Sequence, residues 1–253
     1  MHSIKSLLVV WKSKEKNLYF HIGTLSYDGE KYIFEYTHHS NSHRKVLDAV
    51  RNGYRIHPAF PDVHKKYIAA SLFPAFDRRI PSSDRVDYKK VLKDLNLPFG
   101  ADRMDILRET RGILSGDAYS FEEPLRVYEN NQFETNFYIN GMRHQDLPEN
   151  WVSRLSVGSS LQAIPDYDNE FDPYAVKMET VEGIQLGYVP GVSAQAVKAL
   201  VERGVQLSFY VKEIKSTLAP QWWVRVNLIG NLETASDGIF NEKDFEGLIF
   251  KVA

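Results

Sequence analysis

The stretch 167–190 constrains the fold of this chain more than any other segment. An acidic turn leads into an alternating strand near 174–178, and a Glu182-Gly183 turn leads into a second short strand. That strand ends at residues 187–190, which read Gly-Tyr-Val-Pro. Alternating residues on both sides of a tight glycine turn are typical of a β-hairpin.

The loop before this hairpin concentrates negative charge around two aromatic rings. The rings are Tyr167 and Phe171, and the carboxylates are those of Asp166, Asp168, Glu170 and Asp172. So many like charges in one short loop suggest that something uses them. Calcium is one alternative, because three of the carboxylates alternate as at the start of an EF-hand loop. However, the sixth position is Phe171 and the twelfth is Lys177, where that loop requires Gly and Glu.

Three motifs in this half resemble a known family. Residues 169–176 read Asn-Glu-Phe-Asp-Pro-Tyr-Ala-Val, residues 186–190 read Leu-Gly-Tyr-Val-Pro, and residues 137–144 form an upstream strand and turn. Together they resemble the HIRAN domain over roughly residues 133–230. The resemblance implies a pocket for the 3′ end of single-stranded DNA.

The resemblance also implies a role for four residues. Phe171 would stack on the terminal base, and Asp172 would accept a hydrogen bond from the 3′-hydroxyl. Arg143 would hold a phosphate, and His144 would occupy a position where the family often has an aromatic ring. The family has a tyrosine at the position of Phe171, so this chain keeps the ring there but lacks the hydroxyl. The alternative is structural: Asp172 stabilises a turn before a proline, and Phe171 lies in the core.

The second half reads as a β-rich domain with one helix. Strands are expected near 133–140, 158–164, 206–214 and 222–229, and a helix after Ser193. This pattern favours a small, partly open barrel. Trp222 and Trp223 are expected on one strand, one ring facing inward and one outward.

The first half reads as a small α+β domain. Strands are expected at 6–11, 18–25 and 32–36, and helices over 87–95 and after Asp102, which is placed to cap the second helix. The fold class predicted for the whole chain is therefore α+β. The expected domains are 1–124 and 136–253, the second with a C-terminal tail, and the polar segment 125–135 is expected to link them.

This half resembles the N-terminal subdomain of HipA-type toxin kinases over about residues 5–123. Segments 23–25, 34–36, 71–81 and 105–121 carry the likeness. The kinase core is absent, since no phosphate-binding glycine loop or metal-binding Asp-Phe-Gly occurs. The resemblance implies a partner that docks on a HipA-type kinase. The residues expected to form the docking surface are Phe73, Phe76, Arg78 and Arg79. The alternative is that these residues form a solvated surface next to side chains anchored in the core.

Charge and motifs exclude several function classes. Residues 1–125 carry 20 Lys and Arg against 16 Asp and Glu, a balance of +4, and residues 126–253 carry 11 against 17, a balance of −6. A long duplex footprint is therefore not expected on the second half. No hydrolase elbow or nucleotide-binding loop is present. The histidines His38, His39 and His43 lack ligands to complete a zinc site. We expect no catalytic residues, cofactor or metal.

The chain has no cysteine, no long apolar run and no pattern of a cleaved signal peptide, so we expect a cytoplasmic protein without a membrane span. The leading hypothesis is a non-catalytic regulatory component of a bacterial toxin–antitoxin or defence system. It would dock a HipA-type kinase and bind 3′ ends of single-stranded DNA. One alternative is a DNA-repair or replication accessory protein that binds such ends. Another is a protein-interaction module without DNA binding.

Overall fold

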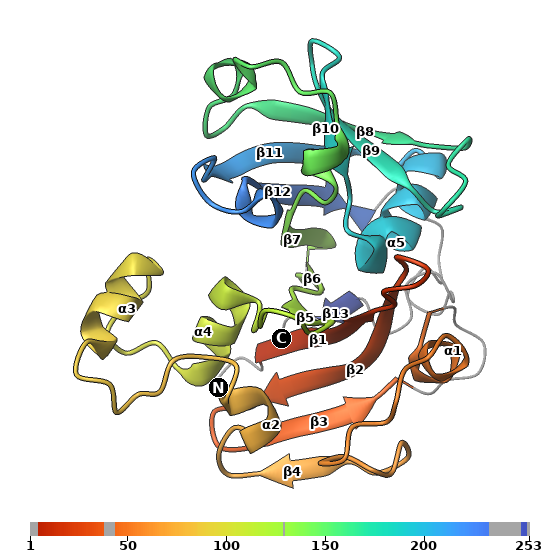
Figure 1. The fold of residues 1–253 in the computed structure, drawn as a ribbon. Coiled ribbons are helices and arrows are strands. Elements are labelled where there is room, and N and C mark those ends of the chain that lie inside the picture. The colour runs from red at the N-terminus through yellow and green to blue at the C-terminus, as the bar shows by residue number, and fades with distance from the viewer. Residues whose placement is uncertain (1–4, 38–43, 129, 233–248, 252–253) are drawn as a thin grey trace. The chain divides into compact units, whose positions relative to one another are not determined.

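The computed structural model describes residues 5–37, 44–128, 130–232 and 249–251 (Figure 1). The chain divides into two compact units, Met1–Pro124 (unit 1) and Leu125–Ala253 (unit 2). Both mix strands with a few helices, which confirms the predicted α+β class. The expectations for His38, His39 and His43, and for the C-terminal tail apart from residues 249–251, lie outside the described residues.

Unit 1 is built on a five-stranded antiparallel sheet of order β4-β3-β2-β1-β5. Its strands are β1 (Lys5–Lys12), β2 (Tyr19–Tyr27), β3 (Tyr32–Tyr36), β4 (Tyr67–Ala69) and β5 (Tyr119–Glu122). The β2–β3 hairpin turns at Asp28, whose Oδ1 accepts hydrogen bonds from the amides of Glu30 and Lys31 at 2.9 and 2.7 Å. The strands expected at 6–11, 18–25 and 32–36 are thus confirmed.

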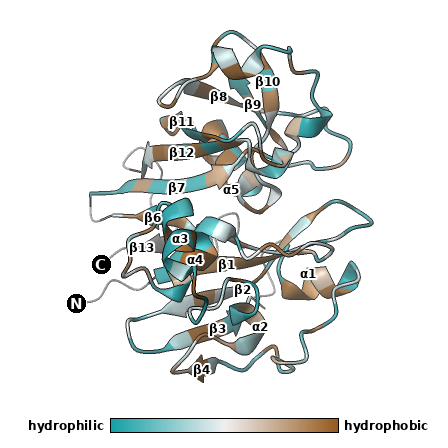
Figure 2. Ribbon diagram, turned by 60° about the vertical axis from the view of Figure 1, so that its left-hand side comes forward, coloured by the Kyte–Doolittle hydropathy of each residue, from teal (hydrophilic) through white to brown (hydrophobic). Residues whose placement is uncertain are grey.

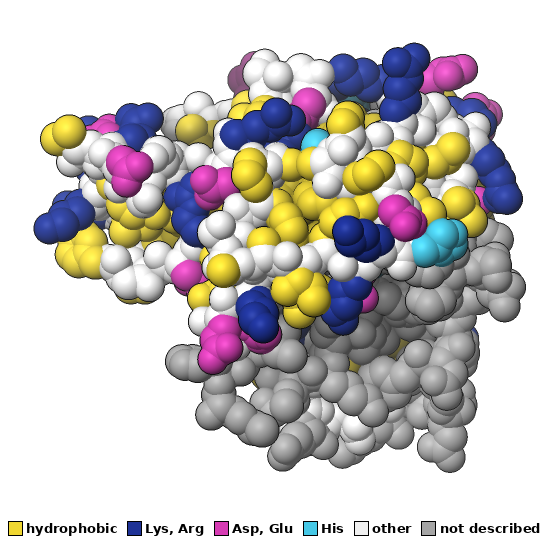
Figure 3. Space-filling model, turned by 90° about the horizontal axis from the view of Figure 1, so that it is seen from below, with side chains coloured by type: hydrophobic (Ala, Val, Ile, Leu, Met, Phe, Trp, Pro, Cys, Tyr) yellow, Lys and Arg dark blue, Asp and Glu magenta, His cyan; other side chains and the backbone are white. Residues whose placement is uncertain are grey.

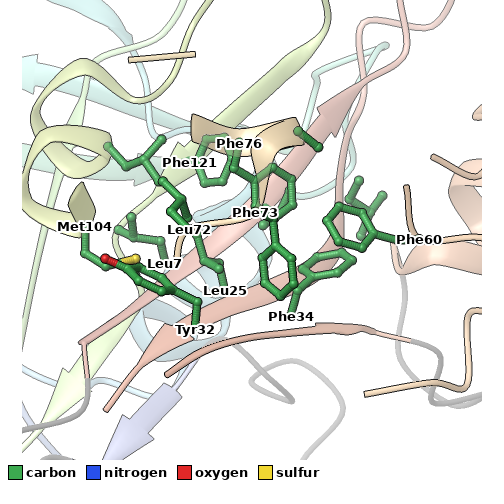
Figure 4. Close-up of a cluster of buried hydrophobic side chains, with 14 of the residues drawn as sticks. Leu7, Leu25, Tyr32, Phe34, Phe60, Leu72, Phe73, Phe76, Met104 and Phe121 are labelled. Carbon is green, nitrogen blue, oxygen red and sulfur yellow. The ribbon is translucent and has the colours of Figure 1, made fainter. Parts of the chain in front are cut away.

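The core of unit 1 is aromatic. The helices of the unit are α1 (Val46–Arg51), α2 (Pro74–Asp77), α3 (Tyr88–Asp94) and α4 (Arg103–Thr110). Figure 4 shows Phe34, Phe60, Phe73 and Phe76 gathered together over the strands, and the centroids of Phe34 and Phe60 lie 4.6 Å apart. Asp102 caps α4 as expected, since its side chain accepts from two amides in the first turn.

A buried histidine on β2 makes the stability of unit 1 depend on pH. His21 is 2% exposed, and its Nδ1 lies 3.2 Å from Nζ of Lys45. Burial holds the pKa of His21 well below its ordinary value, and the ammonium of Lys45 lowers it further. His21 therefore binds a proton near pH 6.5 in the unfolded chain but not in the folded chain.

We predict that the free energy of unfolding of unit 1 decreases as pH falls below about 6.5, by up to about 1.4 kcal/mol per pH unit. Amide exchange in β2, followed in urea at several pH values, gives the free energy of unfolding and its slope against pH. His21→Asn removes the titrating group and should flatten the slope between about pH 5 and 6.5. Equal slopes for the wild type and the variant would contradict this account.

Unit 2 is one eight-stranded sheet of order β10-β9-β8-β11-β12-β7-β6-β13, which curls into a partly open barrel as predicted. Its strands are β6 (Leu125–Val127), β7 (Gln132–Tyr138), β8 (Ser160–Pro165), β9 (Val176–Thr180), β10 (Gln185–Tyr188), β11 (Leu207–Ile214), β12 (Val224–Asn231) and β13 (Ile249–Lys251). Its helices are α5 (Gly191–Glu202) and three short 3-10 turns, η1 (Met142–His144), η2 (Trp151–Arg154) and η3 (Pro220–Trp222). Helix α5 begins at Gly191, whereas the sequence predicted that it begins after Ser193.

Two expectations for this half are wrong. The segment 125–135 is no linker, because it contains β6 and the start of β7, and Arg126 and Val127 pair with Glu134 and Phe133. The two adjacent tryptophans do not lie on a strand. Trp222 ends η3 and packs edge-on against Tyr138, and Trp223 packs against Trp151 with 5.4 Å between the ring centroids. Neither ring belongs to the exposed apolar surface.

Hydropathy follows the architecture of each unit. Figure 2 shows apolar residues on strands and helices of both units, whereas β7 is largely hydrophilic and the connecting loops are mostly hydrophilic. Among the residues that the structure describes, no helix combines the length and apolar character needed to cross a membrane.

Candidate single-stranded DNA interface

The predicted site lies in unit 2 where β8 passes through a loop into β9. The β9–β10 hairpin is confirmed, with Lys177 opposite Tyr188 and Met178 opposite Gly187. The loop spans residues 166–175 and is closed at its base by a hydrogen bond of 2.9 Å from the amide of Asp166 to the carbonyl of Ala175. The strands thus hold both ends of the loop.

Asp166 is the buried anchor of this loop. It is 7% exposed, and its Oδ1 lies 3.0 Å from Nζ of Lys177. Its Oδ2 accepts hydrogen bonds from the hydroxyl of Tyr188 at 3.1 Å and from Nδ2 of Asn169 at 3.2 Å. Burial opposes ionisation of Asp166, but the bonds from Asn169, Lys177 and Tyr188 outweigh it and lower the pKa of this carboxyl. Its charge is therefore compensated internally.

Asn169 transmits this anchoring to the tip of the loop. Its Oδ1 accepts hydrogen bonds from the amides of Phe171 and Asp172 at 3.1 and 2.9 Å, an Asx turn. Asp172 fixes the next turn, because its Oδ1 accepts from the amide of Tyr174 at 2.9 Å. The backbone that carries Phe171 and Asp172 is therefore held by side chains on both sides.

Phe171 is not a core residue. Its side chain is 77% exposed, which rules out the structural alternative for this ring. Leaving a phenylalanine ring in water forgoes about 2 kcal/mol of burial energy. The ring stands on a constrained backbone, so its exposure is a property of an ordered loop. Asp172 does stabilise a turn before Tyr174, as the alternative supposed, and it is partly exposed beside the ring.

Arg143 and His144 lie on η1, which is tied to the end of β10. Asn140 and Tyr188 exchange two backbone hydrogen bonds of 2.9 Å. Gly187 allows this close approach: its φ is +153°, and a Cβ there would lie 2.4 Å from the carbonyl oxygen of Asn140. Nε of Arg143 donates to Nε2 of His144 at 2.8 Å, and both side chains are exposed.

Tyr188 connects the two pairs of predicted residues. Its backbone pairs with Asn140, three residues before Arg143, and its hydroxyl donates to Asp166, which holds Asn169 and the Phe171–Asp172 tip. Tyr188 thereby links the segment before η1 to the loop that carries Phe171 and Asp172. Sequence reasoning missed the anchoring roles of Asp166, Asn169 and Tyr188.

The charge of the loop is smaller than its composition suggests. Asp166 is paired with Lys177, while Asp168 and Glu170 are exposed. The structure does not favour calcium binding, because the carboxylate of Asp166 already contacts Lys177, Asn169 and Tyr188. Within the described ranges, no group of three His, Asp or Glu side chains is arranged to hold a metal ion.

The docking surface predicted in unit 1 needs correction. Phe73 and Phe76 are 9% and 2% exposed and lie in the core. Arg79 has a side chain 6% exposed, which pairs with Asp117 and donates to the carbonyl of Gly112 at 2.9 Å. Of the four predicted residues only Arg78 is exposed. Figure 3 shows apolar side chains gathered on one face among Lys and Arg, but the two phenylalanines belong to the interior.

Comparisons with known proteins identify this unit. The HIRAN domain family matches residues 132–227. The chain contains a HIRAN domain at these residues. This confirms the predicted resemblance of the second half and does not extend to residues 1–131, where the likeness to HipA-type kinases stays a prediction. The HIRAN domain includes the whole loop 166–175 and η1.

Two solved structures are similar to part of the chain. One is the HIRAN domain of human HLTF, with 16% identity, a TM-score of 0.34, and coverage of 51% of this chain and 95% of that one. The other is a protein from Lactobacillus plantarum, with 19% identity, a TM-score of 0.33, and coverage of 38% and 96%. At these scores neither structure adds to the assignment. A comparison with curated proteins finds no match.

Proposed function

We propose that the HIRAN domain binds the 3′ end of single-stranded DNA through Phe171, Asp172, Arg143 and His144. The observation that carries this proposal is the 77% exposure of Phe171 on an ordered loop inside the matched domain. An exposed ring on a fixed backbone suits base stacking, which needs little ordering on binding. The partly exposed carboxylate of Asp172 next to it suits a hydrogen bond from a terminal hydroxyl.

Charge distinguishes this site from a general DNA-binding surface. Residues 126–253 have a balance of −6, and Asp168 and Glu170 are exposed on the binding loop itself. Of the four proposed residues Arg143 carries the positive charge for a phosphate, so we expect stacking and the terminal hydrogen bond to supply most of the affinity. One phosphate contact gives a slope of log K against log salt of only about −0.7.

We predict that Phe171→Ala weakens binding of a short single-stranded oligonucleotide by about 1–3 kcal/mol. Fluorescence anisotropy at low and physiological salt measures the loss together with the salt slope. Phe99→Ala is the matched control, because Phe99 is 74% exposed in unit 1 and its removal should leave affinity unchanged. Equal effects of the two substitutions would sink the proposal.

We further propose that the protein is a non-catalytic regulatory component in which unit 1 docks a partner. The resemblance of unit 1 to HipA-type kinases favours such a kinase, from a bacterial toxin–antitoxin system, as the partner. This hypothesis is supported by sequence resemblance alone. A DNA-repair accessory role is equally compatible with the HIRAN domain. Co-purification with a HipA-type kinase, compared between the wild type and Arg78→Glu, separates the two. Failure to retain the kinase would remove the toxin–antitoxin reading.

A further inference from the structure

The two most exposed aromatic side chains in the described part of unit 2 lie on one loop. Phe171 is 77% exposed and Tyr167, four residues earlier, is 71% exposed. The next in rank are Tyr128 at 39% and Tyr210 at 38%. Single exposed apolar residues are common on protein surfaces, but two such rings on one anchored loop are a more specific feature.

Tyr167 is held in place by helix α5. Its hydroxyl donates to Oε1 of Glu202 at 3.1 Å, and Nζ of Lys198 lies over its ring, 4.6 Å from the centroid. The same ammonium donates to the carbonyl of Pro173 at 2.7 Å, and the side chain of Lys198 is only 13% exposed. Lys198 therefore links the start of the loop to its end.

These contacts leave a face of the ring for a ligand. Lys198 covers one side, and the exposure of 71% means that much of the ring remains open to water. A ring whose orientation is already fixed loses little conformational entropy when a base stacks on it. Phe171 shares the exposure, and its backbone is constrained by the hydrogen bond from its amide to Asn169.

We propose that Tyr167 is a second base-stacking residue, which takes a base on the 5′ side of the nucleotide bound at Phe171. This inference depends on the proposed function. The direction follows from chemistry: if the nucleotide at Phe171 and Asp172 carries the free 3′-hydroxyl, the strand continues only toward its 5′ end. The ligand is thus a single strand with at least one further unpaired nucleotide. Lys198 and Glu202 are positioning residues for the ring.

Ligand length tests the proposal. A deoxynucleoside 5′-monophosphate and a hexanucleotide, each with a free 3′-hydroxyl, compete with a labelled oligonucleotide for the full-length protein. Tyr167→Ala should weaken the hexanucleotide about 5- to 150-fold and leave the mononucleotide unchanged. Tyr167→Phe, which keeps the ring, should retain hexanucleotide binding. Phe171→Ala should weaken both ligands.

Tyr210→Ala is the matched control, because Tyr210 pairs with Ser160, at the other end of β8 from the loop. Equal losses for both ligands in Tyr167→Ala would show that Tyr167 only shapes the Phe171 site, and would overturn the inference. No loss for either ligand would overturn it as well, while the proposed function stands if Phe171→Ala still loses binding. A wild-type protein that binds neither ligand would overturn both.

Discussion

Replacing Glu122 with alanine is expected to destabilise unit 1 by about 3–5 kcal/mol. Glu122 pairs with Arg111, whose Nη2 lies 2.5 Å from Oε1 and whose Nε lies 3.2 and 3.0 Å from the two carboxylate oxygens. The side chains are only 9% and 8% exposed. Removing the carboxylate takes the bidentate partner away from a buried guanidinium, which water cannot solvate fully.

Thermal or urea unfolding of the full chain measures this loss. Glu35→Ala is the control, since Glu35 pairs with Lys66 while both side chains are about half exposed, and the expected cost is below about 1 kcal/mol. The double variant Arg111→Met with Glu122→Leu should recover much of the stability lost in Glu122→Ala. A Glu122→Ala variant as stable as Glu35→Ala would contradict this account of the pair.

Replacing Asp166 with alanine is expected to affect both the stability of unit 2 and DNA binding. The change removes the partner of Lys177 and the acceptor of two hydrogen bonds, at a cost of about 2–4 kcal/mol. Asn169 then loses its anchor, and the backbone of Phe171 becomes mobile. We therefore expect an affinity loss at least as large as that of Phe171→Ala, about 1–3 kcal/mol.

Asp168→Ala provides a control for which the expected change in DNA affinity has the opposite sign. Asp168 carries the same charge two residues away but is exposed, so its removal should leave stability unchanged within about 0.5 kcal/mol. It also removes repulsion of the DNA phosphate, so affinity should rise slightly. Anisotropy and thermal unfolding on the two variants measure both effects. Two substitutions that change affinity in the same direction would argue that net loop charge, and not the anchoring by Asp166, controls binding.

The β9–β10 hairpin was predictable because its signals are local. Alternation, the Glu182-Gly183 turn and the motif around Asn169 all act within a few residues, and the structure has the hairpin where they predict it. The role of Asp166 was not predictable in this way. Asp166 and Asp168 look alike in sequence, and only the tertiary neighbours Lys177 and Tyr188 distinguish the buried anchor from the exposed charge.

The errors have similar physical causes. The segment 125–135 looked like a linker because of its polar residues, although Phe133 and Thr135 alternate with them and are buried, at 0% and 3% exposure. Phe73 and Phe76 looked like a surface beside arginines, but both are buried in the aromatic core, Phe73 at the N-cap of α2 and Phe76 within it. Composition alone does not show which face of a short helix is covered.

The free 3′-hydroxyl provides the most direct test of the central claim, that this loop of the HIRAN domain binds single-stranded DNA ends. The measurement compares the affinities of two oligonucleotides of identical sequence, one ending in a 3′-hydroxyl and one in a 3′-phosphate, for the wild type and for Asp172→Asn. The wild type should prefer the free end by at least about tenfold, the equivalent of one charge-assisted hydrogen bond, and the variant should lose most of that preference. Equal affinity of the wild type for both oligonucleotides would contradict the account.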